Sequence, residues 1–86
     1  MALTFDIVTP KGLARHEEGL ERVVVRRREE RFDPGSEVGI CPRHGPLLMQ
    51  TQACTVRLTR GGRTEALDVE PGVLEVLDDR VTLVVT

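Results

Sequence analysis

Cysteine and histidine side chains have the clearest potential for chemistry in this chain. Cys41 and His44 are three positions apart, a spacing found in metal sites, and Cys54 and His16 could complete a set of four ligands. Zinc prefers such ligands in tetrahedral geometry. Structural zinc sites usually combine two close pairs, and this sequence contains one. A metal site at Cys41 and His44 is therefore an alternative, while thiols without a metal are the expectation.

Catalysis has weaker support from the sequence. Cys41 and His44 could act as nucleophile and general base, but Pro42 restrains the segment between them and no convincing orienting acid accompanies them. The glycines at 61–62 precede a strand pattern, whereas a phosphate-binding loop precedes a helix. The adjacent Asp78 and Asp79 fit a turn. We therefore expect neither a catalytic residue nor a cofactor.

Composition restricts the possible partners. The chain has 86 residues, enough for one domain over 1–86, and a formal net charge of −2. It contains no Trp or Tyr on which nucleic-acid bases could stack. In the charge run of residues 26–31, Glu29 and Glu30 offset the arginines, so no nucleic-acid partner is expected. With Phe5 and Phe32 as the only aromatic residues, the core must consist of Val, Leu and Ile.

The elements that would position these residues are predicted to be strands. Apolar and polar residues alternate over segments 3–8, 54–59, 64–70 and 81–85, with the period of two that is typical of half-buried strands. Residues 21–25 predict a second strand. For segment 13–22, the sequence also allows one or two helical turns. Turn signals lie at 10–12, 33–36, 61–62, 71–72 and 78–79. Those at 61–62 and 78–79 lie between strand patterns and predict two hairpins. Eight or so short strands predict an all-β sandwich or barrel.

The beginning of the chain contains no targeting signal. Residues 1–6 lack the basic region and the apolar run of a secretory signal, and no segment has the length and hydropathy of a transmembrane helix. We therefore expect a cytoplasmic protein without direct membrane insertion. Both cysteines are then expected to stay reduced.

Four segments resemble the epsilon subunits of F-type ATP synthases. Residues 37–48 follow that family's pattern E-x-G-I-x-P-x-H-x-P-L-L. Residues 3–12 resemble its first strand and turn, and residues 21–25 resemble its second strand. Residues 72–83 resemble its element G-x-L-E-V-x-x-x-x-V-T-V. The segments occur in the family's order over nearly the whole chain.

The resemblance implies an antiparallel, flattened β-sandwich of about eight to ten short strands. It further implies a non-catalytic subunit of the central stalk, which binds the gamma shaft and the c-ring and helps couple proton translocation to ATP synthesis. The complex would hold the chain at the inner face of the membrane. Matching family positions make Glu37, Gly39, Pro42 and His44 the expected c-ring contacts. The alternative is a stand-alone β-domain with a regulatory metal site at Cys41 and His44.

Three departures from the family pattern limit what is carried over. The chain stops at Thr86, where the sandwich of the family would end, so an inhibitory role of the family's helical hairpin is not expected here. The charged segment 26–32 replaces a shorter link, and residues 53–57 replace a Pro-Gly turn.

Residues 81–85 carry apolar side chains on both strand faces. Because an exposed apolar face promotes association, we expect self-association or a gamma-like partner.

Overall fold

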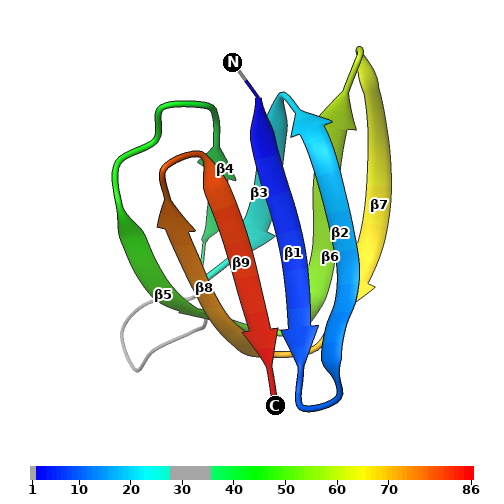
Figure 1. Cartoon of the computed structure of the whole chain (residues 1–86), viewed down its shortest axis with the longest axis vertical. Coiled ribbons are helices and arrows are strands. Elements are labelled where there is room, and N and C mark those ends of the chain that lie inside the picture. Colours follow the sequence, from blue (N-terminus) through cyan, green and yellow to red (C-terminus); the bar gives the residue numbers. More distant parts are fainter. Residues whose placement is uncertain (1, 28–35) are drawn as a thin grey trace.

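The structure, a computed structural model, describes residues 2–27 and 36–86, which form a two-layered β-sandwich (Figure 1). The strands are β1 (Leu3–Thr9), β2 (Gly12–Leu20), β3 (Arg22–Arg26), β4 (Glu37–Ile40), β5 (Leu47–Thr51), β6 (Cys54–Arg60), β7 (Arg63–Val69), β8 (Gly72–Leu77) and β9 (Arg80–Val85). Most of the predicted turn at 33–36 and most of the charge run at 26–31 lie outside the described residues.

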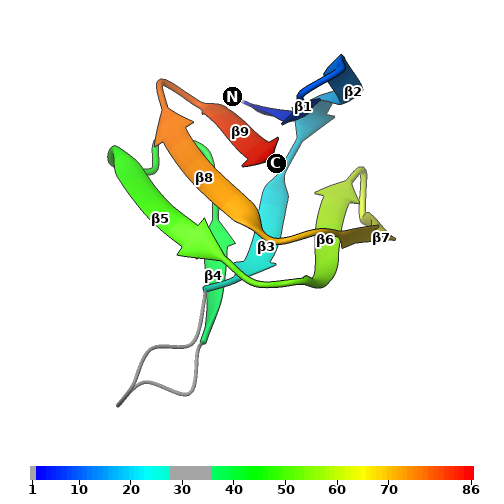
Figure 2. The ribbon, with the colours of Figure 1, turned by 90° about the horizontal axis from the view of Figure 1, so that it is seen from below.

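The strands form a five-stranded sheet, β2-β1-β9-β8-β5, and a four-stranded sheet, β4-β3-β6-β7. Figure 2 shows both layers from below, with β4 and β5 toward one side and β2 and β7 toward the other. The predicted sandwich is confirmed. One pair departs from the antiparallel pattern, because β1 and β9 run parallel. Parallel neighbours need a long connection, and here the remainder of the chain provides it.

Segment 13–22, which the sequence left open, is strand rather than helix. Residues 12–20 form β2, so the strand predicted at 21–25 is the third strand, β3, and its assignment as the second was wrong. The pairing of β2 with β1 shifts register twice, between Leu3 and Phe5 and between Ile7 and Val8. Each irregularity inserts residues that break the period of two. This explains why the alternation of β2 is hidden in the sequence.

Both predicted hairpins are confirmed. Gly61 and Gly62 join β6 to β7 with φ values of 58° and 76°. Asp78 and Asp79 join β8 to β9 with φ values of 50° and 62°. Positive φ at both central residues is what a type I′ turn requires, and its twist matches that of the flanking strands. Aspartate tolerates this backbone conformation better than most non-glycine residues do.

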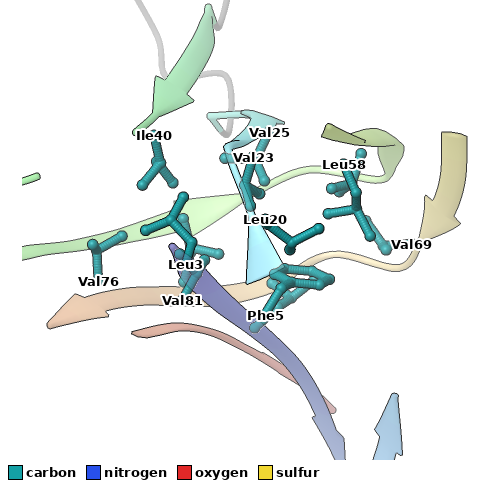
Figure 3. Close-up of a cluster of buried hydrophobic side chains, with 13 residues drawn as sticks. Leu3, Phe5, Leu20, Val23, Val25, Ile40, Leu58, Val69, Val76 and Val81 are labelled. Atoms are coloured by element: carbon teal, nitrogen blue, oxygen red, sulfur yellow. The ribbon is translucent and has the colours of Figure 1, made fainter. Parts of the chain in front are cut away.

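Among the described residues the core consists mainly of Leu, Val and Ile side chains, as the composition predicted, and it also contains the Phe5 ring. Leu3, Phe5 and Val81 of the five-stranded sheet meet Val23 and Leu58 of the four-stranded sheet in Figure 3. These five side chains are at most 2% exposed. Full burial of one such side chain contributes about 1.5–3 kcal/mol. Packing between the layers therefore holds the two sheets together.

An ionic network links the two sheets on the β2 side. Arg15 of β2 contacts Glu17 (Nε–Oε2 3.1 Å) and Glu65 of β7, and Arg60 of β6 contacts Glu17 (Nη2–Oε1 2.5 Å). The Arg60 guanidinium, with a smaller contribution from Arg15, lowers the pKa of the Glu17 carboxyl. The network places charges along edge strands, which discourages pairing with other chains.

Candidate partner-binding surfaces

The loop of residues 41–46 carries two of the four predicted contact residues. It leads from β4 in one layer to β5 in the other and lies beside the β8–β9 hairpin (Figure 1). Within it, the His44 backbone N–H donates to the carbonyl oxygen of Cys41 at 3.1 Å. Arg43 has a φ of 67°, in the left-handed region. Loop 41–46 is therefore a defined turn with Pro42 inside it.

His44 is half-buried beside an open groove between β4 and β5. Its Nδ1 lies 2.7 Å from the carbonyl oxygen of Gly45. Because a carbonyl only accepts, this contact assigns the proton to Nδ1. The groove has a volume of about 480 Å³ and is lined by His44, Val38, Arg27 and the β5 residues 47–50. Loop 41–46 thus offers a partner both the imidazole of His44 and the apolar side chains of the groove beside it.

The other two predicted contact residues lie on a different surface, the outer face of the four-stranded sheet. Glu37 Oε2 accepts from Arg57 Nη1 at 2.8 Å. The guanidinium of Arg22 lies over Gly39, where an added Cβ would be 2.8 Å from Nη2. Gly39 therefore has a packing role of its own. The structure groups Pro42 with His44 and Glu37 with Gly39, and does not bring the two pairs together.

The residues considered as candidate metal ligands, among those the structure describes, are not assembled into one site. Within residues 2–27 and 36–86, no three His, Cys, Asp or Glu side chains form a group that could hold a metal ion. His16 instead contacts Asp6 through Nδ1 and Glu18 through Nε2 (3.3 Å). The Asp6 carboxylate, followed by Glu18, raises the pKa of His16. Cys41 is an exposed free thiol, and Cys54 is a half-buried one that packs against the core.

An apolar row crosses the outer face of the five-stranded sheet. It consists of Leu13, Val8, Val84 and Val73, which are paired in that order across β2, β1, β9 and β8. Leu13, Val84 and Val73 are 63%, 42% and 40% exposed. The sequence signalled this row only through the two apolar faces of residues 81–85. The other members were missed because strand register, which places them side by side, is not visible in the sequence.

A polar row lies next to the apolar row on the same face. His16, Asp6, Thr82 and Glu75 are paired in that order across the same four strands. Glu18, bound to His16, adds a third carboxylate to this face. The apolar row is therefore bordered on one side by acidic groups.

The remaining exposed leucines lie nearer to loop 41–46. Leu48 of β5 is 71% exposed and Leu77 of β8 is 47% exposed. With Pro46 they border a hollow of about 320 Å³. All the exposed large apolar side chains among the described residues lie on the five-stranded sheet: Leu48 and Leu77, together with Leu13, Val73 and Val84 of the apolar row.

The fold and these surfaces define a small, two-sheet β-sandwich domain with an exposed apolar row on one outer face. The family model described as ATP synthase, Delta/Epsilon chain, beta-sandwich domain matches residues 2–86, so the chain belongs to this family. The resemblance found in the sequence is thereby confirmed. Among the described residues, no helix is long and apolar enough to cross a membrane.

Curated relatives support the same family. The chain is 36% identical to the ATP synthase epsilon chain of Bacillus licheniformis over 81 residues, which cover 94% of this chain and 56% of the relative. It is 35% identical to that of Acidithiobacillus ferridurans over 83 residues, 96% of this chain and 55% of the relative. For Desulfitobacterium hafniense the identity is 34% over 82 residues, covering 93% and 55%. The chain thus spans slightly more than half the length of these relatives.

Proposed function

We propose that this chain is an epsilon-type, non-catalytic subunit in the central stalk of an F-type ATP synthase. In this role it binds the gamma shaft and the c-ring and helps couple proton translocation to ATP synthesis. The complex holds it at the inner face of the membrane, on the cytoplasmic side. The support is membership of the family, together with relatives named ATP synthase epsilon chain.

The apolar row is the observation that carries the proposed gamma contact. Neighbouring strands are about 4.8 Å apart, so four strands spread the row over roughly 14 Å. Side chains three or four positions apart on a helix have Cβ atoms about 5–6 Å apart. A helix that lies across the strands therefore places one side chain on each residue of the row, Leu13, Val8, Val84 and Val73. Asp6 and Glu75 in the adjoining row favour a helix with basic residues on that flank.

Loop 41–46 is the proposed c-ring contact, with Pro42 and His44 as its central residues. Its turn is already formed in the isolated chain, since His44 is bonded to Cys41 through the backbone. A preformed loop loses little conformational freedom on binding. Glu37 and Gly39 are proposed as a second part of the c-ring contact, on the outer face of the four-stranded sheet, where Glu37 is ion-paired with Arg57.

The gamma contact is tested with the purified chain and the gamma subunit of the same organism. Gamma at one hundred times its dissociation constant stabilises the folded chain by about 2.7 kcal/mol. For a domain of this size the melting temperature then rises by roughly 10 °C or more. Sedimentation of the mixture should show a joint species. A monomer whose melting temperature does not respond to gamma would contradict the assignment.

The c-ring contact is tested by charge reversal in the reconstituted complex. Glu37→Lys should weaken the coupling of ATP hydrolysis to proton pumping, because a like charge replaces an attractive one at the interface. Arg57→Gln is the matched control, since it removes the same ion pair and leaves Glu37 in place. Unchanged coupling in Glu37→Lys, or an equal loss in both variants, would count against Glu37 as a ring contact.

A further inference from the structure

One residue of the β8–β9 turn connects three segments of the chain. The backbone carbonyl oxygen of Asp79 accepts from the Thr4 N–H at 3.0 Å, at the beginning of β1. Its carboxylate oxygen Oδ1 accepts from the Arg43 backbone N–H at 2.6 Å, inside loop 41–46. Asp79 is half-buried between these contacts. A single turn residue thus ties loop 41–46 to the end of the five-stranded sheet.

The amide bonded to Asp79 belongs to Arg43, the residue of loop 41–46 that has a positive φ. Arg43 has a φ of 67°, in the left-handed region, which is unfavourable for residues other than glycine. Such a conformation persists when the surrounding structure holds it in place. A hydrogen bond from a backbone N–H to a carboxylate is among the stronger ones in proteins. The contact with Asp79 therefore acts on the residue that sets the direction of the loop.

We propose that Asp79 is the positioning residue of loop 41–46. By holding Arg43 in the left-handed conformation, its carboxylate presents Pro42 and His44 to the partner in one orientation. The positioning itself stands on the geometry of the isolated chain. The identification of the partner as the c-ring rests on the proposed function.

The neighbouring residue provides a matched control. Asp78 lies in the same turn, also with positive φ (50°, against 62° for Asp79). Asp78 is exposed, and no hydrogen bond or ion pair to its carboxylate is found within residues 2–27 and 36–86. The change Asp→Ala therefore has a similar backbone effect at both positions. Only at Asp79 does it remove an acceptor for loop 41–46.

The first measurement is amide hydrogen exchange of loop 41–46 in the isolated chain, followed by NMR. Asp79→Ala should lower the protection of the Arg43 amide by about tenfold, the effect expected for losing a bond to a charged acceptor. Asp78→Ala should leave that protection unchanged. Asp79→Asn should restore part of it, because the amide oxygen can still accept. The amides of β6 and β7 should exchange alike in all variants.

The second measurement is binding of the c-ring and of gamma by the same variants. Asp79→Ala should weaken c-ring binding about tenfold and leave gamma binding unchanged, with partial rescue by Asp79→Asn. Unchanged Arg43 protection in Asp79→Ala, or an equal loss in Asp78→Ala, would overturn the positioning role. Lost protection together with unchanged c-ring binding would uphold the positioning of the loop and contradict the c-ring as its partner.

Discussion

The outer face of the five-stranded sheet exposes apolar side chains, whereas the outer face of the four-stranded sheet is covered by ion pairs and hydroxyl groups. On the first, Leu13 and Val84 stand open to solvent in the apolar row. On the second, Glu37 is paired with Arg57 at 2.8 Å, and the Thr55 hydroxyl donates to Asp68 at 2.8 Å. Both faces belong to the same sandwich and share one core.

This difference indicates which of the two faces gains more free energy when it binds a partner. A face whose polar groups are already bonded to each other or to water gains little from a partner. An apolar row gains free energy when a partner removes it from water, by about 25 cal/mol for each Å² buried. The row lies mainly on inner strands of its sheet, with Val8 and Val84 on β1 and β9. It therefore favours docking on the face rather than pairing at a sheet edge.

Adding one methyl group at Gly72 of the five-stranded sheet should be the most destabilising of these changes. In Gly72→Ala the new Cβ would lie 2.2 Å from the backbone oxygen of Val84, so β8 and β9 must separate. Overpacking against backbone should cost about 3 kcal/mol and lower the melting temperature by roughly 10–20 °C. Calorimetry measures this directly. The loss should extend to gamma binding, because Val84 belongs to the apolar row.

Gly39→Ala is the counterpart in the four-stranded sheet. Its new Cβ would meet the end of the flexible Arg22 side chain, which can move aside. The melting temperature should change by less than about 4 °C, and gamma binding should not change. Similar destabilisation by Gly72→Ala and Gly39→Ala would contradict the close approach of β8 and β9.

Removal of the ion pair on the four-stranded sheet should have a small effect. Arg57→Gln breaks the contact with Glu37. In the wild type, both side chains of this ion pair are nearly half exposed. Exposed pairs of this kind contribute about 0–1 kcal/mol. Urea denaturation should therefore give nearly the wild-type free energy of unfolding. A loss of several kcal/mol would show that this face depends on its charges far more than the structure indicates.

A pH dependence that arises from the polar row should be weaker still. Asp6 and Glu18 raise the pKa of His16 above its ordinary value of 6.5. Protonated His16 therefore adds stability that is fully present below pH 6.5 and is lost as the pH rises through the raised pKa. His16→Gln should have a lower melting temperature than the wild type at about pH 5.5, and the difference should vanish at high pH. A difference that grows with pH would contradict the pairing.

Local signals predicted much of the fold. The glycines at 61–62 and the aspartates at 78–79 marked both hairpins, because few residue pairs accept two positive φ values in succession. Alternation located β1, β6 and β9. It failed in β2, where two register shifts interrupt the period of two. The parallel pairing of β1 with β9 also escaped prediction, since it joins opposite ends of the chain.

The candidate surfaces were harder to predict than the strands. The resemblance selected Glu37, Gly39, Pro42 and His44 as one group, and the structure divides them between a strand face and a loop. The apolar row and the Asp79 contact both join segments that are far apart in the sequence. Strand register and the packing of neighbouring turns create them, and neither is encoded in a short motif.

The proposed binding of the gamma shaft to the apolar row is tested by measuring the affinity of gamma for a row variant. The variant replaces Leu13, Val73 and Val84 by threonine, which keeps a high strand propensity. Two controls accompany it. Leu48→Thr combined with Leu77→Thr changes the same face outside the row, and Arg57→Gln changes the opposite face.

Loss of three apolar contacts worth about 1 kcal/mol each should weaken gamma binding roughly 100-fold in the row variant. Titration calorimetry should show both controls within about threefold of the wild type. Wild-type affinity in a folded row variant, or an equal loss in Arg57→Gln, would contradict the claim that gamma binds this face.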